Sequence, residues 1–87
     1  MYNYEVISSL QKILNKLSKK NKPLYEQVLI KINEIINTFN VEHYKNLKYI
    51  QKDEKRVHIG HFVLTFTFIR AENKIKFLDF DHHDNIY

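Results

Sequence analysis

The chain has 87 residues, a formal net charge of +4 at pH 7, 44% hydrophobic residues and no cysteine. This length supports one hydrophobic core, which predicts a single domain over residues 1–87, and the apolar content excludes a disordered chain. The composition excludes disulfides and thiolate metal sites, and the lack of a leader segment or a long apolar run predicts a soluble, cytoplasmic protein without membrane contact.

The first half of the chain predicts one strand and two helices. Residues 2–7 alternate in the period of a strand with one buried face. A helix is predicted over residues 9–20, where Ser8 and Gln11 have the spacing of a capping box. Pro23 breaks this helix and starts a second one that ends near residue 39. Two apolar stripes recur at helical spacing: Leu10, Ile13, Leu14 and Leu17 in the first helix, and Leu24, Val28, Ile32, Ile35, Ile36 and Phe39 in the second.

The second half predicts three strands. A polar segment over residues 40–54 enters a strand over residues 56–59, and Gly60 stands where a hairpin needs a positive φ. Residues 61–70 have apolar or small side chains on both faces, as a central strand does, and residues 75–81 form the last strand. The order β-α-α-β-β-β predicts an α+β fold, an antiparallel sheet with an N-terminal helical hairpin packed on one face and the first strand at one edge.

This order and the C-terminal residues resemble the toxin superfamily that includes RelE and ParE, the toxins of type II toxin–antitoxin modules. Its members commonly show a basic strand, a glycine turn, a hydrophobic strand, and an ending of the type G-H-R-x-x-V-Y. The chain reads RVHIGHFVLTFTF in the first part and DHHDNIY in the last. The positions that match are Arg56, Gly60, His82, Ile86 and Tyr87.

The chain departs from the family pattern at Val63 and His83, where arginines that hold and polarise the scissile phosphate are common. The resemblance implies a RelE-like, ribosome-dependent messenger RNA endonuclease that uses no metal or other cofactor. It also implies a RelB-like antitoxin that forms a hetero-oligomer with the toxin. The missing arginines leave two alternatives open: a ParE-like toxin that binds DNA gyrase, and a degenerate member that binds an antitoxin without cleaving RNA.

The chemistry of RNA cleavage selects the candidate site residues. A base takes the proton of the 2′-hydroxyl, an acid protonates the leaving 5′-oxygen, and positive charge balances the phosphate. The resemblance assigns Arg56 as the phosphate clamp and three acid–base candidates: His83, His58 and Tyr87. Three lysines are predicted to bind RNA: Lys48, Lys52 and Lys55. The same side chains also fit a solvated strand face and a solvated C-terminal tail.

Two other groups of residues have competing interpretations. The carboxylates and imidazoles of residues 79–84 suit a zinc-type ion. Strand alternation, however, places Asp79 and Asp81 opposite His82, so we predict no metal site. The first helix carries a row of lysines that forms either its solvated face or a contact with RNA backbone: Lys12, Lys16, Lys19 and Lys20.

Overall fold

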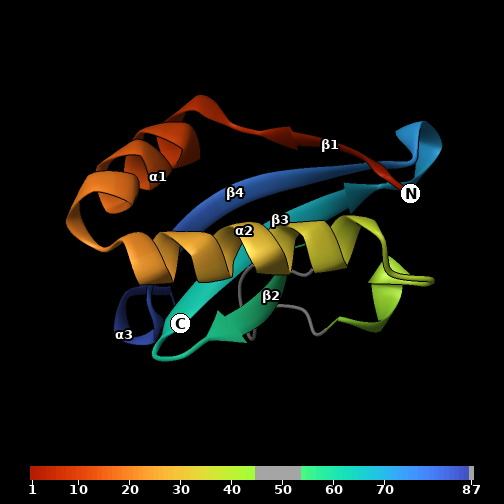
Figure 1. Ribbon diagram of the computed structural model, residues 1–87. Coiled ribbons are helices and arrows are strands. Elements are labelled where there is room, and N and C mark those ends of the chain that lie inside the picture. Colours follow the sequence, from red (N-terminus) through yellow and green to blue (C-terminus); the bar gives the residue numbers. More distant parts are fainter. Residues whose placement is uncertain (45–53, 87) are drawn as a thin grey trace.

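The computed structural model describes residues 1–44 and 54–86 and consists of a four-stranded sheet with two helices packed on one face (Figure 1). The predicted order β-α-α-β-β-β is confirmed. The strands and helices are β1 (Asn3–Val6), α1 (Ser8–Lys20), α2 (Lys22–Ile36), β2 (Glu54–Ile59), β3 (Phe62–Ile69), β4 (Lys74–His82) and α3 (His83–Ile86). Two short 3₁₀ turns complete the described chain, η1 (Val41–His43) and η2 (Arg70–Glu72).

The strand order in the sheet is β1-β4-β3-β2. β3 is antiparallel to both β2 and β4, as predicted, whereas β1 pairs with β4 in parallel, with Asn3 opposite Lys74 and Val6 opposite Phe77. Two successive antiparallel pairings leave β2 and β4 pointing the same way, and β1 shares their direction. The sheet is therefore antiparallel in three strands and parallel at the edge that β1 forms.

The predicted capping box at the start of α1 is wrong. The N-cap position is held by Ile7, which is extended and makes no side-chain cap hydrogen bond. The Ile7 N–H donates to the Phe77 carbonyl at 3.2 Å, and the Ile7 carbonyl accepts from Gln11 N–H at 2.9 Å. Strand β1 thus runs directly into α1, and pairing with the sheet positions the first turn in place of a polar cap.

α2 ends three residues earlier than predicted, at Ile36. The Ile36 carbonyl accepts the Tyr2 N–H at 2.9 Å, and the Tyr2 hydroxyl accepts from Val41 N–H at 3.1 Å. The chain therefore turns sharply around Tyr2 and returns Val41 to the core, where it is fully buried. Phe39, the last residue of the apolar stripe predicted for the second helix, lies on the outside of this turn and is completely exposed, so it does not pack in the core as the rest of such a stripe would.

The hydrophobic core lies between the two helices and one face of the sheet. A register shift between Thr65 and Phe66 pairs these residues with Asp79 and Phe77, which leaves Leu78 as an extra residue in β4. This bulge changes the alternation, so Phe77 and Phe80 both join the core although they are three residues apart. The buried core residues are Leu10, Leu14, Val28, Ile32, Ile35, Ile36, Val41, Ile59, Leu64, Phe66, Ile75, Phe77 and Phe80.

Two tight turns connect the last three strands. Gly60 has a φ of 62° between β2 and β3, which confirms the predicted turn. Asn73 has a φ of 49° and ends η2 before β4, at a position where asparagine is tolerated. Within the described residues no helix could cross a membrane, since α2, the longest, has 15 residues.

An ion pair joins β1 to β4 and makes the stability dependent on pH. Glu5 and Lys74 lie 2.8 Å apart, and the hydrogen bond and charge of Lys74 lower the pKa of Glu5 below 4.5. The same pair raises the pKa of Lys74 above 10.5. Because the carboxylate is favoured in the folded state, its contribution is present above pH 4.5 and is lost as pH falls through the lowered pKa.

We expect the substitution Glu5→Gln to flatten the dependence of melting temperature on pH below about 4.5. The effect is small, because both side chains are solvent-exposed in part and water screens the pair. Thermal unfolding followed by circular dichroism between acid and neutral pH measures it. Equal acid slopes for the two proteins would show that the pair contributes nothing to stability.

Candidate active site

The two faces of the sheet differ in chemistry. Directly paired residues on neighbouring strands project to the same face, so Arg56, Thr65 and Asp79 form one row across β2, β3 and β4. A second row on the same face contains His58, Val63 and Asp81. These rows lie opposite the face that α1 and α2 cover, and we call them the helix-free face. Arg56 and His58 are two residues apart in β2 and therefore project to the same face.

Part of the helix-free face is nevertheless shielded from solvent. Thr65 is 4% exposed and Val63 is fully buried, although Val63 is not part of the main core. The short helix α3 packs against both β3 and β4, and the His83 N–H donates to the His61 carbonyl at 3.0 Å. We call the end of the sheet where β2 meets β3 and β4 meets α3 the hairpin end. Because α3 packs there, the hairpin end is a bounded site rather than an open strand surface.

Arg56 is half-buried in β2, and its Nη1 atom is shielded from solvent. A guanidinium held in partly desolvated surroundings interacts more strongly with an anion than one in bulk water does. His58, two residues further along β2, is exposed and reachable by a ligand. The two side chains therefore offer a cation and a proton-transfer group on the same face.

His83 is the first residue of α3 and is half-exposed. Its Nε2 lies 3.2 Å from Oδ1 of Asp84, so the carboxylate can orient the imidazole. Its Nδ1 is shielded from solvent and has no hydrogen-bond partner within the described chain. A partly accessible imidazole oriented by a carboxylate has the form of a general acid or base.

Val63 occupies the position where the family has an arginine. It lies between His58 and Asp81 in its row and is fully buried, so it offers neither charge nor a hydrogen bond to a phosphate. Within the described strands, Arg56 is therefore the arginine on the helix-free face that could bind a phosphate.

Four of the predicted site residues are not placed on the helix-free face. Lys48, Lys52 and Tyr87 lie outside the described residues. Lys55 pairs with the core residue Phe66 and so projects to the helix-covered face. Its ammonium donates to the carbonyls of Glu42 and Tyr44 at 3.4 Å each, which ties β2 to η1. The RNA-binding role of these lysines stays a prediction.

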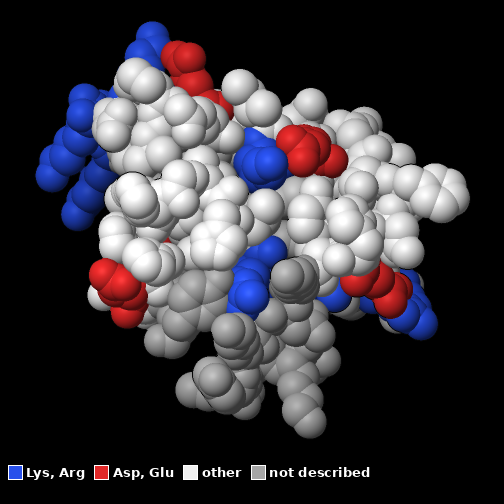
Figure 2. All heavy atoms as spheres, turned by 90° about the horizontal axis from the view of Figure 1, so that it is seen from below, with Lys and Arg blue, Asp and Glu red and all other residues white. Residues whose placement is uncertain are grey.

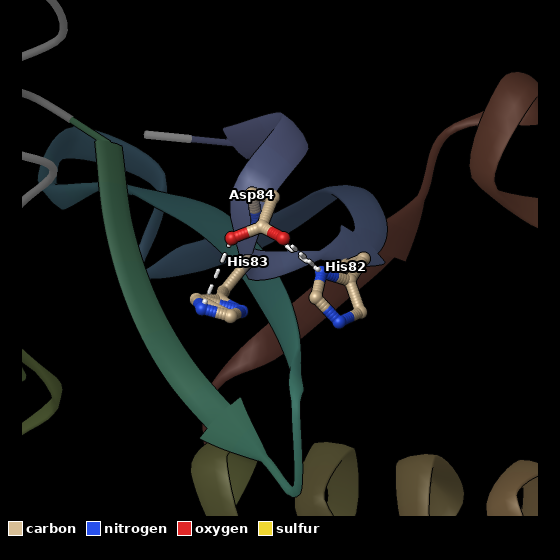
Figure 3. A group of neighbouring side chains, drawn as sticks. All are labelled: His82, His83 and Asp84. Carbon is tan, nitrogen blue, oxygen red and sulfur yellow. Dashed lines mark hydrogen bonds and ion pairs between the residues drawn. The ribbon is translucent and has the colours of Figure 1, made fainter.

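Two histidines that are not among the predicted catalytic residues, His61 and His82, lie at the hairpin end. His82 pairs with Phe62, and its ring stacks on that of His61 with centroids 6.3 Å apart. The rings of His82 and His83 are 4.6 Å apart. Figure 3 shows the Asp84 carboxylate between His82 and His83, with one oxygen directed at each ring. The sequence signal for this cluster is a histidine after the hairpin glycine together with a histidine pair at the end of the last strand.

α1 carries a second charged surface. Lysine and arginine side chains gather at the left of Figure 2, on the side of α1. The lysines that α1 exposes are Lys12, Lys16, Lys19 and Lys20. They fit a solvated helix face and also a contact with nucleic-acid backbone, as the sequence analysis left open.

A shallow pocket of about 420 Å³ lies at the opposite end of the β3–β4 hairpin from the histidines. Its lining consists of Met1, Tyr2, Asn37, Thr38, Phe39 and Asn73. None of these residues supplies an imidazole, a carboxylate or a guanidinium. The pocket therefore plays no part in the chemistry of the hairpin end.

Comparisons with known proteins give both a relative and a fold. The chain is 51% identical over its whole length to a protein of Methanocaldococcus jannaschii with the name "Putative toxin RelE4", and it covers 92% of that protein. No protein-family model matches. The isolated RelE toxin of E. coli has a similar structure, with a TM-score of 0.76 at 15% identity over 94% of this chain and 84% of that one. The intact E. coli RelBE toxin–antitoxin complex contains a chain with a TM-score of 0.75 at 17% identity, over 94% and 96% of the two chains.

Proposed function

Since this chain belongs to the RelE family of toxins, we propose that it is a ribosome-dependent messenger RNA endonuclease, the toxin of a type II toxin–antitoxin module. The observation that carries the proposal is the match to a RelE toxin across the full chain. The hairpin end supports it, because a guanidinium and two imidazoles lie on or beside a face that the helices leave uncovered.

Arg56 binds the scissile phosphate in this proposal and balances the negative charge that builds on its oxygens during the reaction. One imidazole takes the proton of the 2′-hydroxyl, whose oxygen then bonds to phosphorus. The bond from phosphorus to the 5′-oxygen breaks, and a second acid protonates that oxygen. The products are a 2′,3′-cyclic phosphate and a free 5′-hydroxyl.

His83 and His58 are the acid–base pair that the described chain offers. His83 is the stronger candidate, because Asp84 orients its ring and its backbone is fixed to β3 through the His61 carbonyl. His58 is exposed on the same sheet face as Arg56. Tyr87 keeps its proposed role as a third proton-transfer group at the C-terminus.

The partner in the proposed module is a RelB-like antitoxin that silences the toxin in a hetero-oligomer. The structural likeness to a chain of the RelBE complex supports this assignment. A net charge of +4 favours an acidic antitoxin segment, which would cover the same positive surface that meets ribosomal and messenger RNA.

Primer extension on messenger RNA from programmed ribosomes tests the proposed activity. We expect cuts within the A-site codon, weakened by about 10²- to 10⁴-fold in the His83→Ala variant, as for loss of a general acid or base. The Tyr87→Ala variant is expected to weaken the cuts as well. The matched control is His43→Ala, which removes a histidine of η1 outside the site and leaves cleavage unchanged.

Absence of cuts with the unmodified protein, on ribosomes from a suitable host, would overturn the nuclease proposal. The buried Val63 in place of a family arginine is the observation that favours a gyrase-binding toxin instead. A DNA gyrase supercoiling assay on the same preparation decides that alternative. A protein inactive in both assays that still binds its antitoxin is the degenerate member.

A further inference from the structure

One nitrogen from each of His82 and His83 and one carboxylate oxygen of Asp84 all lie within 4.8 Å of one another. We propose that these three residues bind a zinc-type transition-metal dication at the hairpin end. The binding step is independent of the proposed nuclease activity. The ion occupies this site and is not required for RNA cleavage.

The separations within the cluster suit such an ion. Zinc bonds of about 2.0–2.2 Å place neighbouring ligand atoms of a tetrahedron about 3.4 Å apart. His82 Nδ1 lies 3.4 Å from Oδ2 of Asp84, and His83 Nε2 lies 3.2 Å from Oδ1. Each ring therefore lies at ligand spacing from a different oxygen of the Asp84 carboxylate, and Figure 3 shows one oxygen directed at each ring. His82 Nδ1 accepts the Asp84 N–H in the described conformation, so metal binding requires these partly exposed side chains to rotate until their lone pairs meet at one ion.

Strand alternation separates Asp79 and Asp81 from His82, but it does not separate His82, His83 and Asp84. Asp79 and Asp81 do project to the helix-free face, away from His82. The chain, however, leaves β4 after His82 and turns into α3, so His83 and Asp84 no longer follow the period of a strand. The helical turn brings them back toward His82, and the Asp84 N–H donates to His82 Nδ1 at 3.3 Å.

Neighbouring groups hold the three ligands in place. The Asp81 carboxylate accepts from the His82 N–H at 2.7 Å and from the side-chain amide of Asn85 at 3.2 Å, which fixes the turn between β4 and α3. The His82 ring lies against His61 and against the edge of Phe62, whose ring centroid is 5.6 Å away. Such outer contacts favour a defined orientation of a ligand and strengthen metal binding.

The donor set indicates which ions fit. Two imidazole nitrogens and one carboxylate oxygen suit zinc and its borderline neighbours, whereas magnesium and calcium prefer oxygen alone. Three protein ligands leave the fourth position to water, as in open zinc sites. The side chains of His82 and His83 are 39% and 42% exposed, so the ion can enter from solvent without unfolding the chain.

A consequence for activity rests on the proposed function. If His83 transfers a proton during cleavage, a metal bound to its Nε2 displaces the contact with Asp84 and disfavours the protonated ring that this transfer forms. Metal-loaded toxin is then a slower nuclease than metal-free toxin. Chelation restores its rate.

Binding is tested on tag-free protein, since a histidine tag would itself bind the ion. Isothermal titration with zinc chloride and the visible absorption of cobalt(II) report occupancy without any ribosome. We expect one ion per chain, a melting temperature that rises with zinc and returns with a chelator, and affinity at least about tenfold weaker in both His82→Ala and Asp84→Asn. His43→Ala is the matched control and binds as the unmodified chain does.

Two results would overturn the metal site: no binding at submillimolar zinc, and binding that is unchanged in both His82→Ala and Asp84→Asn. In either case the contacts of Asp84 are ion pairs only. Cleavage is measured separately with and without chelator. A protein that binds zinc through these residues but does not cleave would refute the proposed nuclease and support the metal site. A protein that cleaves but does not bind zinc would support the nuclease and refute the metal site.

Discussion

Replacing Arg56 with alanine is expected to slow the cleavage of ribosome-bound messenger RNA by about 10²- to 10³-fold, as for the loss of one preorganised electrostatic contact to a reacting oxyanion. Arg56 lies on the helix-free face of β2, outside the hydrophobic core, so the variant should keep its fold. Initial rates of A-site cleavage measure the loss, and circular dichroism confirms that the protein is folded. An Arg56→Lys variant should recover part of the rate, because lysine keeps the charge without the bidentate geometry.

The chain contains a matched control for this experiment in Arg70, its other arginine. Arg70 lies in η2, at the opposite end of β3 from the hairpin end, and its exposed side chain pairs with Glu42. Arg70→Ala removes the same charge and should leave cleavage unchanged. Equal losses in the two variants would mean that net charge alone determines activity, which would refute the role of Arg56 as phosphate clamp.

Replacing Phe66 with alanine is expected to destabilise the fold by about 3–5 kcal/mol. Phe66 is fully buried at the centre of β3, and its ring lies 5.8 Å from Phe77 and 5.6 Å from Tyr44. A chain of this size has a total stability of roughly 5–15 kcal/mol, so the variant loses a large fraction of it. We expect the melting temperature to fall by more than about 12 °C, measured by calorimetry or circular dichroism.

Phe39→Ala makes the same chemical change at a fully exposed site. Its free energy of unfolding should stay within about 0.5 kcal/mol of the unmodified protein. A loss of stability at Phe39 comparable to that at Phe66 would contradict the described turn. In that turn the Tyr2 N–H donates to the carbonyl of Ile36, the last residue of α2, and Phe39 points to solvent. The pair of variants thus tests where the core ends.

The elements of the fold follow from local patterns, whereas their pairing does not. The stripes that begin at Leu10 and Leu24 and the glycine at position 60 are visible within short windows, and the structure contains the helices and the turn they predict. The bulge at Leu78 is set by the pairing of β3 with β4, so alternation alone could not place both Phe77 and Phe80 in the core. The parallel pairing of β1 likewise depends on residues about seventy positions away.

The candidate site shows the same division between local and long-range information. Alternation along β2 is enough to predict that Arg56 and His58 share a face. The approach of His61 to His82 requires the register of the β3–β4 hairpin, and the position of Asp84 requires the turn into α3. The face of Lys55 was readable from its place beside Arg56, but its contacts with the Glu42 and Tyr44 carbonyls depend on the path of the chain after α2.

The pairing of β1 with β4 joins the beginning of the chain to its end. Neither α1 nor α2 has a complete surface to pack on until β4 has been synthesised, because Ile75, Phe77 and Phe80 supply part of the core. Contacts of such long sequence separation form late. We therefore expect the nascent chain to stay unfolded until its C-terminal strand leaves the exit tunnel. Under the proposed function, the toxin is inactive until β4 has joined the sheet, so the chain can meet its antitoxin as it folds.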